Sequence, residues 1–379
     1  MHFANIVGIG RTKTAEHWSR GLVDLAVEAG GAAMDEAACR PTAVIVANAL
    51  GAALGDQRNL AAHVAASLGL PNVETATVEA DEAAGGAALR FALALIGSDI
   101  HEQVLVIGAE KATDALPDAL EAARATGLDV FQEAGFGFGL PVAAALAMQR
   151  YIEEHKVDRA EFYHLSALAH AHGARNKSAF FSWPLGEEQY LKSPLVADPV
   201  TVCDTAPPCD GAAAVVVRRP NGETPGNVRI SGSSSISRRP SISDPSLDLS
   251  LPVARASAMA AMAEAKVELD DISLFELHDS STIMAALSLE AVGLAAPGKA
   301  LSVAASGDLS LDGPHPTWTF GGHKARGHAI GAAGLYQVVE ATLQLRAEAG
   351  DNQVRDATCA LVQCLGSFGS TAVTHVLSR

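Results

Sequence analysis

Two histidines stand where an apolar strand or a glycine-rich turn gives way to a helix. His278 ends the apolar run LFELH at 274–278, and His328 lies in the turn GGHKARGHAIG at 321–331. Polar side chains at strand ends of layered α/β proteins commonly face the functional site. We therefore interpret His278 and His328 as candidate catalytic residues. A helix cap or a buried, hydrogen-bonded histidine is the alternative for each.

A carboxylate and a thiol are the other candidates for chemistry. Glu82 begins the helical segment EAAGGAALR at 82–90. A helix N-terminus favours negative charge, so Glu82 needs no catalytic role there. The alternative is a general base in a partly dry pocket, where burial raises the pKa of the carboxyl group toward neutrality. Cys364 is either a reactive thiol or a small buried side chain. Asp210 and Asp279 are expected to orient loops.

These residues depend for their positions on alternating strands and helices. Strands are expected at 6–9, 43–47, 103–107, 212–217, 228–231, 274–277, 357–363 and 371–377, and helices at 21–38, 60–68, 83–98, 253–267, 281–292 and 328–349. Apolar strands separated by helices are buried on both faces, which is typical of layered α/β folds.

The same order of elements occurs twice along the chain. A glycine-rich turn feeds a terminal β-run in CDGAAAVVVRR at 209–219 and again in GSFGSTAVTHVLSR at 366–379. This indicates a duplication, with an N-terminal half at 1–219 and a C-terminal half at 228–379, joined by a Pro/Gly/Asn-rich connector at 220–227. A mixed stretch at about 115–197 interrupts the first half and is expected to form a cap over one face.

Composition excludes several classes of protein. The 379 residues are 49% hydrophobic and carry a formal net charge of −16, which argues against nucleic acid or an anionic membrane as the main partner. Five cysteines without a CxxC pair suggest neither a disulfide framework nor a zinc site. The N-terminus has no long apolar segment and the chain no transmembrane run, so we expect a cytoplasmic protein.

Seven ordered blocks resemble the thiolase superfamily, specifically its sterol-carrier-protein-type branch. The blocks are IVGIGRT at 6–12, EAAGGAALR at 82–90, HAHGARNKSAFF at 170–181, ADPVTVCDTAPPCDGAAAVVV at 197–217, FELHDSSTIMAALSLEAVGL at 275–294, and GGHKARGHAIGAAGLYQ with QCLGSFGSTAV at 321–337 and 363–373. Together they span essentially the whole chain. The resemblance implies a duplicated thiolase fold of the α/β class, five-layered αβαβα, with an inserted loop domain.

The resemblance also implies roles for individual residues. His278 and His328 match two family positions that hold the thioester oxygen of a CoA substrate, one commonly through a water. A second anion hole in the family uses backbone N–H groups, here those of Glu82 and Gly366. Glu82 stands at the position of the nucleophilic cysteine, and Cys364 matches an acid/base position. A carboxylate there cannot form the thioester acyl-enzyme of ordinary thiolysis.

The basic residues Arg175, Lys177, Lys324 and Arg326 are candidates for pairing with CoA phosphates, with solvated surface charge as the alternative. The resemblance implies neither a metal nor a bound organic cofactor. Family members form dimers, so a homodimer or a dimer of dimers is expected. Some nucleophile-free relatives work with a small zinc-ribbon and OB-fold protein, which is a further candidate partner.

Three functions remain open for this sequence. The first is carbon–carbon bond chemistry on an acyl-CoA without an acyl-enzyme, such as retro-aldol cleavage of a 3-hydroxyacyl-CoA, with Glu82 or Cys364 as the base. Known aldolases of this kind use tyrosines, and none of the four tyrosines is assigned. The second is a conventional acetyl-CoA C-acyltransferase, which the missing cysteine argues against. The third is a non-catalytic subunit that binds CoA esters.

Overall fold

The computed structural model describes residues 4–55, 57–220, 226, 228–238 and 249–379. The described strands include a nine-stranded mixed sheet with the order β3-β2-β4-β7-β1-β8-β11-β10-β9. Its strands are β1 (Ala4–Arg11), β2 (Ala43–Ala47), β3 (Glu74–Val78), β4 (Gln103–Glu110), β7 (Gly211–Arg218), β8 (Val228–Ser237), β9 (Leu274–Glu276), β10 (Cys359–Gly366) and β11 (Thr371–Ser378). Each of the eight strands predicted from sequence overlaps one of these. The sequence did not predict β3, whose half-polar ETATV lies at the sheet edge.

The two halves of the sheet repeat one pairing scheme. In the first half β1 is antiparallel to β7, β7 is antiparallel to β4, and β4 is parallel to β2. In the second half β8, β11, β10 and β9 pair in the same senses. Strands β1 and β8 join the halves through three antiparallel residue pairs. The repeat confirms the predicted duplication. The exact domain boundaries stay a prediction, because 221–225 and 227 of the connector lie outside the described residues.

Successive side chains along a strand point in turn to the central helices and to the outer helices. On β4, Val104 and Val106 face the central cluster, while Leu105 and Ile107 face the opposite side. The central cluster contains α4 (Ala84–Gly97) and α12 (Ala333–Leu345), packed between the two halves of the sheet. The outer faces are covered by α1 (Leu22–Ala37) and α3 (Leu60–Ser67) on one side, and by α9 (Pro252–Ala265) and α10 (Thr282–Val292) on the other. This is the predicted five-layered αβαβα arrangement.

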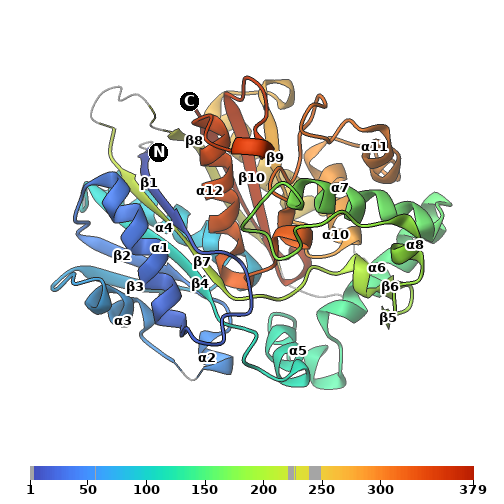
Figure 1. Cartoon of the computed structure of the whole chain (residues 1–379), viewed down its shortest axis with the longest axis horizontal. Coiled ribbons are helices and arrows are strands. Elements are labelled where there is room, and N and C mark those ends of the chain that lie inside the picture. The colour runs from blue at the N-terminus through green and yellow to red at the C-terminus, as the bar shows by residue number, and fades with distance from the viewer. Residues whose placement is uncertain (1–3, 56, 221–225, 227, 239–248) are drawn as a thin grey trace.

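The insertion in the first half packs on the second half. Its elements are α5 (Pro117–Ala125), α6 (Leu140–His155), α7 (Tyr163–Gly173), α8 (Glu187–Leu191), β5 (Leu195–Ala197) and β6 (Val200–Thr201). Helices α6 and α7 share a core cluster with α10, and α7 also contacts α11 (Ala300–Ser306). Figure 1 shows these green helices beside the orange α10 and α11. The insertion therefore covers the face on which the second half places its helices.

One helix boundary differs from the prediction. The helix expected to begin at residue 328 begins at Ala333, after a short 3-10 turn, η7 (Ile330–Ala332). The preceding residues Gly322–Arg326 form a turn of π-helix, η6. A π-turn arises where one residue is accommodated beyond the ordinary helical repeat, and it is common at functional sites.

No helix in the described part of the chain has the length and apolar character to cross a membrane.

Candidate functional site

Glu82 lies at the centre of a buried cluster of polar side chains. It is part of the 3-10 turn η1 (Asp81–Ala83), which leads into α4, and only 3% of its surface is exposed. Its Oε2 lies 3.1 Å from Nε2 of His278, and its Oε1 lies 3.0 Å from Nε2 of His328. The structure thus brings together three residues singled out from the sequence. Both histidines point at the same carboxylate.

The surrounding backbone fixes the two histidines. His278 is the second residue after β9, and its Nδ1 faces the backbone N–H of Leu365 at 3.4 Å. An amide N–H can only donate, so Nδ1 accepts and Nε2 carries the proton of the neutral ring. His328 donates its backbone N–H to the Pro207 carbonyl and accepts from the Cys209 N–H. The main chain of His328 is therefore held by the segment that leads into β7.

Arg124 supplies a third donor that the sequence did not suggest. It lies in the last turn of α5 in the insertion, and its Nη2 is 3.2 Å from Oε1 of Glu82. Its Nη1 donates to Oε1 of Glu121 at 3.0 Å. The helix sequence PDALEAARA contains no unusual spacing that sets this arginine apart. Only the packing of the insertion onto the core reveals it.

The environment makes Glu82 a stable anion. Burial by itself raises its pKa, but the imidazoles of His328 and His278 outweigh burial and hold the pKa of Glu82 well below its usual value. Burial lowers the pKa of His328, although Glu82 opposes that shift. Glu82 is therefore a carboxylate that accepts a hydrogen bond from the neutral ring of His328. Of the two alternatives for Glu82, a carboxyl pKa raised toward neutrality considered burial without the donors, and the unliganded protein has the pKa lowered instead.

A third histidine packs between the first two. The ring of His323, in the π-turn, stacks on His328 with centroids 4.8 Å apart and meets His278 edge-on at 4.9 Å. Asp279 holds this turn by accepting the backbone N–H groups of His323 at 2.7 Å and Lys324 at 3.2 Å. Asp279 thus has the loop-orienting contacts expected of it. Burial and the neighbouring histidines hold the pKa of His323 well below its usual value.

Asp81 accepts a backbone N–H group beside Glu82. Its Oδ2 accepts the N–H of Ser367 at 2.7 Å and faces the hydroxyl oxygen of Ser367 at 3.4 Å. Glu82 and Gly366 were expected to form an anion hole from their N–H groups. The structure brings Gly366 close to this turn, where an added Cβ would lie 2.6 Å from the Ala80 carbonyl oxygen. An anion hole formed by the N–H groups of Glu82 and Gly366 stays a prediction.

Cys364 lies behind the cluster, within the packing of the two central helices. Its Sγ would be 2.4 Å from a Cβ added at Gly86 of α4 and 2.9 Å from one added at Gly334 of α12. Burial raises the pKa of the Cys364 thiol to about 12. The glycines let both helices approach the sulfur closely. These surroundings are those of a small buried side chain, which was one of the two alternatives for Cys364.

A narrow pocket opens onto one side of Glu82. Its volume is about 40 Å³, and it is lined by Glu82, Arg124, Leu140, Pro141, Ala144, Thr205, Ala206, His278, Ser280, Ser281, Met284 and Phe368. None of these described residues is a cysteine. Ser280 places its Oγ 2.9 Å from Nε2 of His278. The described residues include no group of three or more histidine, cysteine or acidic side chains arranged to hold a metal ion.

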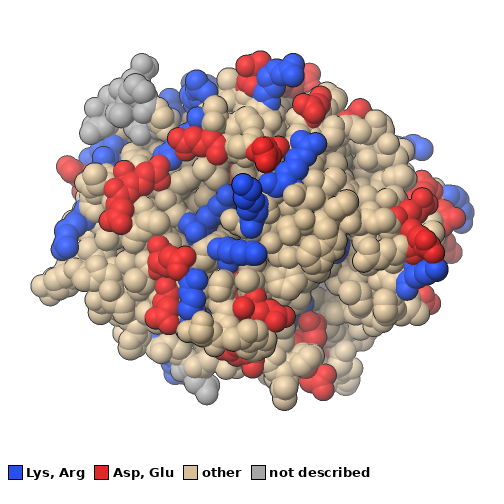
Figure 2. All heavy atoms as spheres, viewed as in Figure 1, with Lys and Arg blue, Asp and Glu red and all other residues tan. Residues whose placement is uncertain are grey.

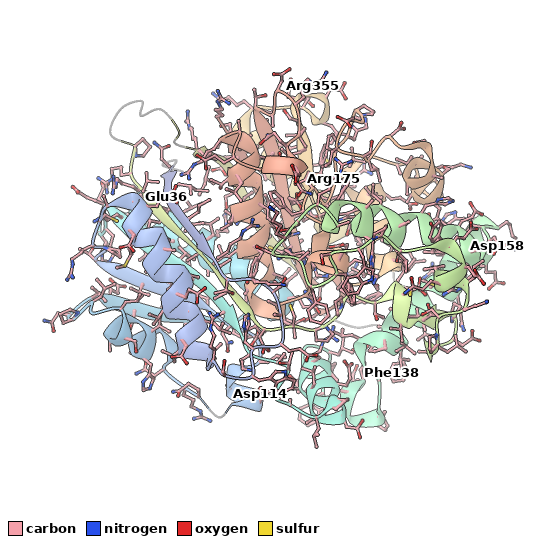
Figure 3. The ribbon with its side chains drawn as sticks, in the orientation of Figure 1. Glu36, Asp114, Phe138, Asp158, Arg175 and Arg355 are labelled. Carbon is pink, nitrogen blue, oxygen red and sulfur yellow. The ribbon has the colours of Figure 1, made fainter. Side chains whose placement is uncertain are left out.

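The structure separates the four basic residues considered for CoA phosphates. Arg175 and Lys177 are exposed just beyond α7, and Figure 3 labels Arg175 on the face where Figure 2 shows Lys and Arg side chains gathered near the middle. Lys324 is buried, with its Nζ 5.4 Å from the centre of the Phe181 ring. Arg326 is also buried, with its guanidinium over the ring of Tyr336. Only the exposed pair can meet a phosphate group in solvent.

Known proteins are similar to this chain over its whole length. Residues 234–379 match the family described as "Thiolase C-terminal domain-like". The acetyl-CoA acetyltransferase of Methanothermobacter thermautotrophicus is 32% identical over 391 residues, which cover 100% of this chain and 100% of the relative. Sterol carrier protein 2 of Homo sapiens is 29% identical over 388 residues, which cover 97% of this chain and 71% of the relative.

A solved structure shares the fold. The protein named "Ltp2-ChsH2(DUF35) aldolase" aligns with a TM-score of 0.86 and 22% identity, covering 100% of this chain and 98% of that one. This similarity extends through both halves of the sheet and the insertion.

Proposed function

The chain belongs to the sterol-carrier-protein-type branch of the thiolase superfamily, and on that premise we propose that it acts on a carbon–carbon bond of an acyl-CoA without a cysteine acyl-enzyme. The observation that carries this proposal is the carboxylate of Glu82 between His278 and His328. Glu82 would stand where catalytic thiolases carry the nucleophile. The lack of a thiol among the described residues that line the pocket supports this role.

The two histidines would bind the thioester oxygen of the substrate. Their Nε2 atoms both point at the carboxylate of Glu82, each at a different oxygen. Donors already aimed at a developing oxyanion cost no reorganisation when an enolate forms there. Glu82 therefore occupies, in the free protein, the place that the thioester oxygen would take.

Substrate binding would change Glu82 from a stable anion into a base. The imidazoles lower the pKa of Glu82, whereas burial, the largest single influence, raises it. When the thioester oxygen takes the two N–H groups, burial remains and the pKa of Glu82 rises. A carboxyl group with a pKa nearer the working pH is a better general base. Arg124 would keep the displaced carboxylate in the pocket.

The reaction best supported is retro-aldol cleavage of a 3-hydroxyacyl-CoA. Glu82 removes the proton of the 3-hydroxyl group, the C2–C3 bond breaks, and C3 leaves as an aldehyde or ketone. The electron pair of that bond becomes the enolate of the shortened acyl-CoA, whose oxygen is held by His278 and His328. Glu82 then returns the proton to C2, so that atoms and electrons balance without a further reactant.

Turnover measurements test this proposal. We expect the purified protein to release a carbonyl product from 3-hydroxyacyl-CoA, and Glu82→Gln to abolish this release. Glu153→Gln makes the same chemical change on an exposed side chain of α6 and is the matched control. Release that continues unchanged in Glu82→Gln contradicts the proposed role of Glu82.

Two other functions each have a supporting observation. The name of the Methanothermobacter relative favours acetyl-CoA acetyltransfer. The small pocket and the occupied histidines favour a non-catalytic subunit that binds CoA esters. A covalent acetyl adduct after incubation with acetyl-CoA supports the first. Tight binding of CoA esters without turnover of either substrate supports the second.

Assembly is a further part of the proposal. We propose a homodimer, and the unpaired outer edge of β3 among the described strands supports it. We also propose a small zinc-ribbon and OB-fold partner, by analogy with the two-component name of the solved aldolase. Light scattering of the purified chain, alone and with such a partner encoded nearby, tests both. The cytoplasmic location expected from the sequence stays a prediction.

A further inference from the structure

The pocket beside Glu82 is too small for the substrate that it is proposed to bind. Its volume is about 40 Å³, whereas pockets for small organic ligands usually measure about 300–1,000 Å³. The polar residues that line it include Glu82, Arg124 and His278. The apolar lining residues, which form the apolar wall of the pocket, include Phe368 on the turn between β10 and β11. The simplest way to enlarge the pocket for an acyl group is therefore to move or shorten a side chain of the apolar wall.

Phe368 is held in a conformation that its sequence does not favour. Ser367, Phe368 and Gly369 have φ angles of 47°, 56° and 84°, all in the left-handed region. Such a conformation costs non-glycine residues on the order of 1–3 kcal/mol each, and it persists only where surrounding contacts impose it. The contacts around the turn therefore hold it in a conformation that places the Phe368 side chain at the apolar wall.

Two sets of contacts impose the conformation. The Phe368 ring packs with Leu128, Leu140 and Ala143 of the insertion. On the other side, Asp81 accepts the Ser367 N–H at 2.7 Å and faces its hydroxyl oxygen at 3.4 Å. Figure 3 labels Asp114 and Phe138, which bracket the part of the insertion that carries Arg124 and Leu128.

Gly127 completes the same junction. A Cβ added at Gly127 would lie 3.0 Å from Oδ2 of Asp81 and 3.3 Å from Oγ of Ser367. Three segments thus meet at Asp81: the turn before α4, the turn after β10, and the turn after α5. Asp81 therefore lies where the turn that carries Phe368 meets the insertion that carries Arg124.

We propose that Phe368 determines the size of the acyl group that this pocket accepts, and that Asp81 is the positioning residue that holds Phe368 in place. This inference rests on the proposed function only in requiring that the pocket binds the acyl part of a CoA ester. The acyl group lies between the apolar wall and Glu82. Its length is limited by the Phe368 ring.

Binding of saturated acyl-CoAs of increasing length tests the role of Phe368. By titration calorimetry, we expect Phe368→Ala to bind octanoyl-CoA on the order of tenfold more tightly than the unmodified protein, since burying two further methylene groups is sufficient for this. Acetyl-CoA should bind with unchanged affinity. Phe136→Ala is the matched control, because Phe136 is exposed and lies outside the pocket lining. An unchanged preference among chain lengths in a folded Phe368→Ala variant overturns the proposal.

A milder variant keeps the test decisive if the alanine variant does not fold. Phe368→Leu leaves an apolar side chain on the turn, and we expect a smaller shift in the same direction. No shift in this variant also overturns the proposal. Because binding is measured, the result is independent of turnover: a shifted preference without any product release would refute only the proposed reaction.

Hydrogen exchange tests the role of Asp81. Asp81→Asn keeps the shape of the side chain but weakens its acceptor, so amides at 367–369 should exchange about tenfold faster, as expected for the loss of one charge-assisted hydrogen bond. The preference of Asp81→Asn for acyl length should also broaden toward that of Phe368→Ala. Unchanged exchange at 367–369 together with an unchanged preference contradicts the positioning role.

Discussion

Arg124 of the insertion donates to Glu82 of the core, with Nη2 and Oε1 3.2 Å apart. This contact ties the cap to the anion at the centre of the site. It also places a positive charge of the insertion beside the carboxylate of Glu82.

We predict that Arg124→Gln raises the pKa of Glu82, because a buried carboxylate loses a cationic donor. A charge-assisted hydrogen bond of about 1.5–3 kcal/mol corresponds to a shift of roughly one to two pH units. The acid limb of kcat/KM, which reports the free protein, should move to higher pH by that amount. Arg150→Gln, on the exposed face of α6, is the control. An acid limb that stays in place excludes a role for Arg124 in setting the charge of Glu82.

We predict that His278→Ala and His328→Ala each lower kcat by about a hundredfold or more, because each removes one donor to the enolate oxygen. The double variant should lose less than the product of the two effects, since the pair acts as a unit. His63→Ala, on the exposed side of α3, should leave kcat unchanged. Strict multiplicativity of the two single effects would show that the histidines act at separate points.

We predict that the protein forms no covalent adduct with acetyl-CoA, and that Glu82→Cys does. A thiol at a helix start between two imidazoles has the surroundings that favour a thiolate. Mass spectrometry of the intact chain should show one added acetyl group on the variant alone. An adduct on the unmodified protein, at any residue in the pocket, would support acyl transfer instead.

We predict that Asp81→Asn changes how stability depends on pH. Burial and the charge of Glu82 raise the pKa of Asp81 from 3.8 to about 6, against opposing effects that include Arg124. A carboxyl group that binds its proton more tightly in the folded chain contributes stability below about pH 4, and this is lost as pH rises through about 6. The lost contribution is at most about 3 kcal/mol.

Urea unfolding at several pH values between about 4 and 7 measures this contribution. The unmodified protein should lose more stability than Asp81→Asn across that range as pH rises. Parallel profiles for the two proteins would mean that the pKa of Asp81 is the same in the folded and unfolded chains.

The fold could be predicted from sequence because its signals are local. Runs such as AVIVA at 43–47 and AAAVVV at 212–217 are buried on both faces, and their apolar character alone indicates central strands. The edge strand β3 carries no such signal, because it packs on fewer sides. The π-turn before His328 was also missed, since Gly322 and Gly327 fit an ordinary helix start equally well in the sequence.

The site was predictable only in part. His278, His328 and Glu82 follow recognisable strand or helix boundaries, so their types and positions indicated chemistry. Their mutual geometry did not follow, because Glu82 and His328 are 246 positions apart and only the duplicated sheet brings them together. The lowered pKa of Glu82 has the same origin, since both imidazoles that lower it come from distant segments. Arg124 was missed because nothing local distinguishes it from the other charges of α5.

The most direct test of the central claim is a crystal structure with a 3-hydroxyacyl-CoA analogue in which a methylene group replaces the thioester sulfur. We predict that its carbonyl oxygen lies within hydrogen-bonding distance of Nε2 of both His278 and His328, and that the Glu82 carboxylate has moved to the 3-hydroxyl group. If both histidines still bind Glu82 while the carbonyl lies elsewhere, the proposed exchange of donors is contradicted.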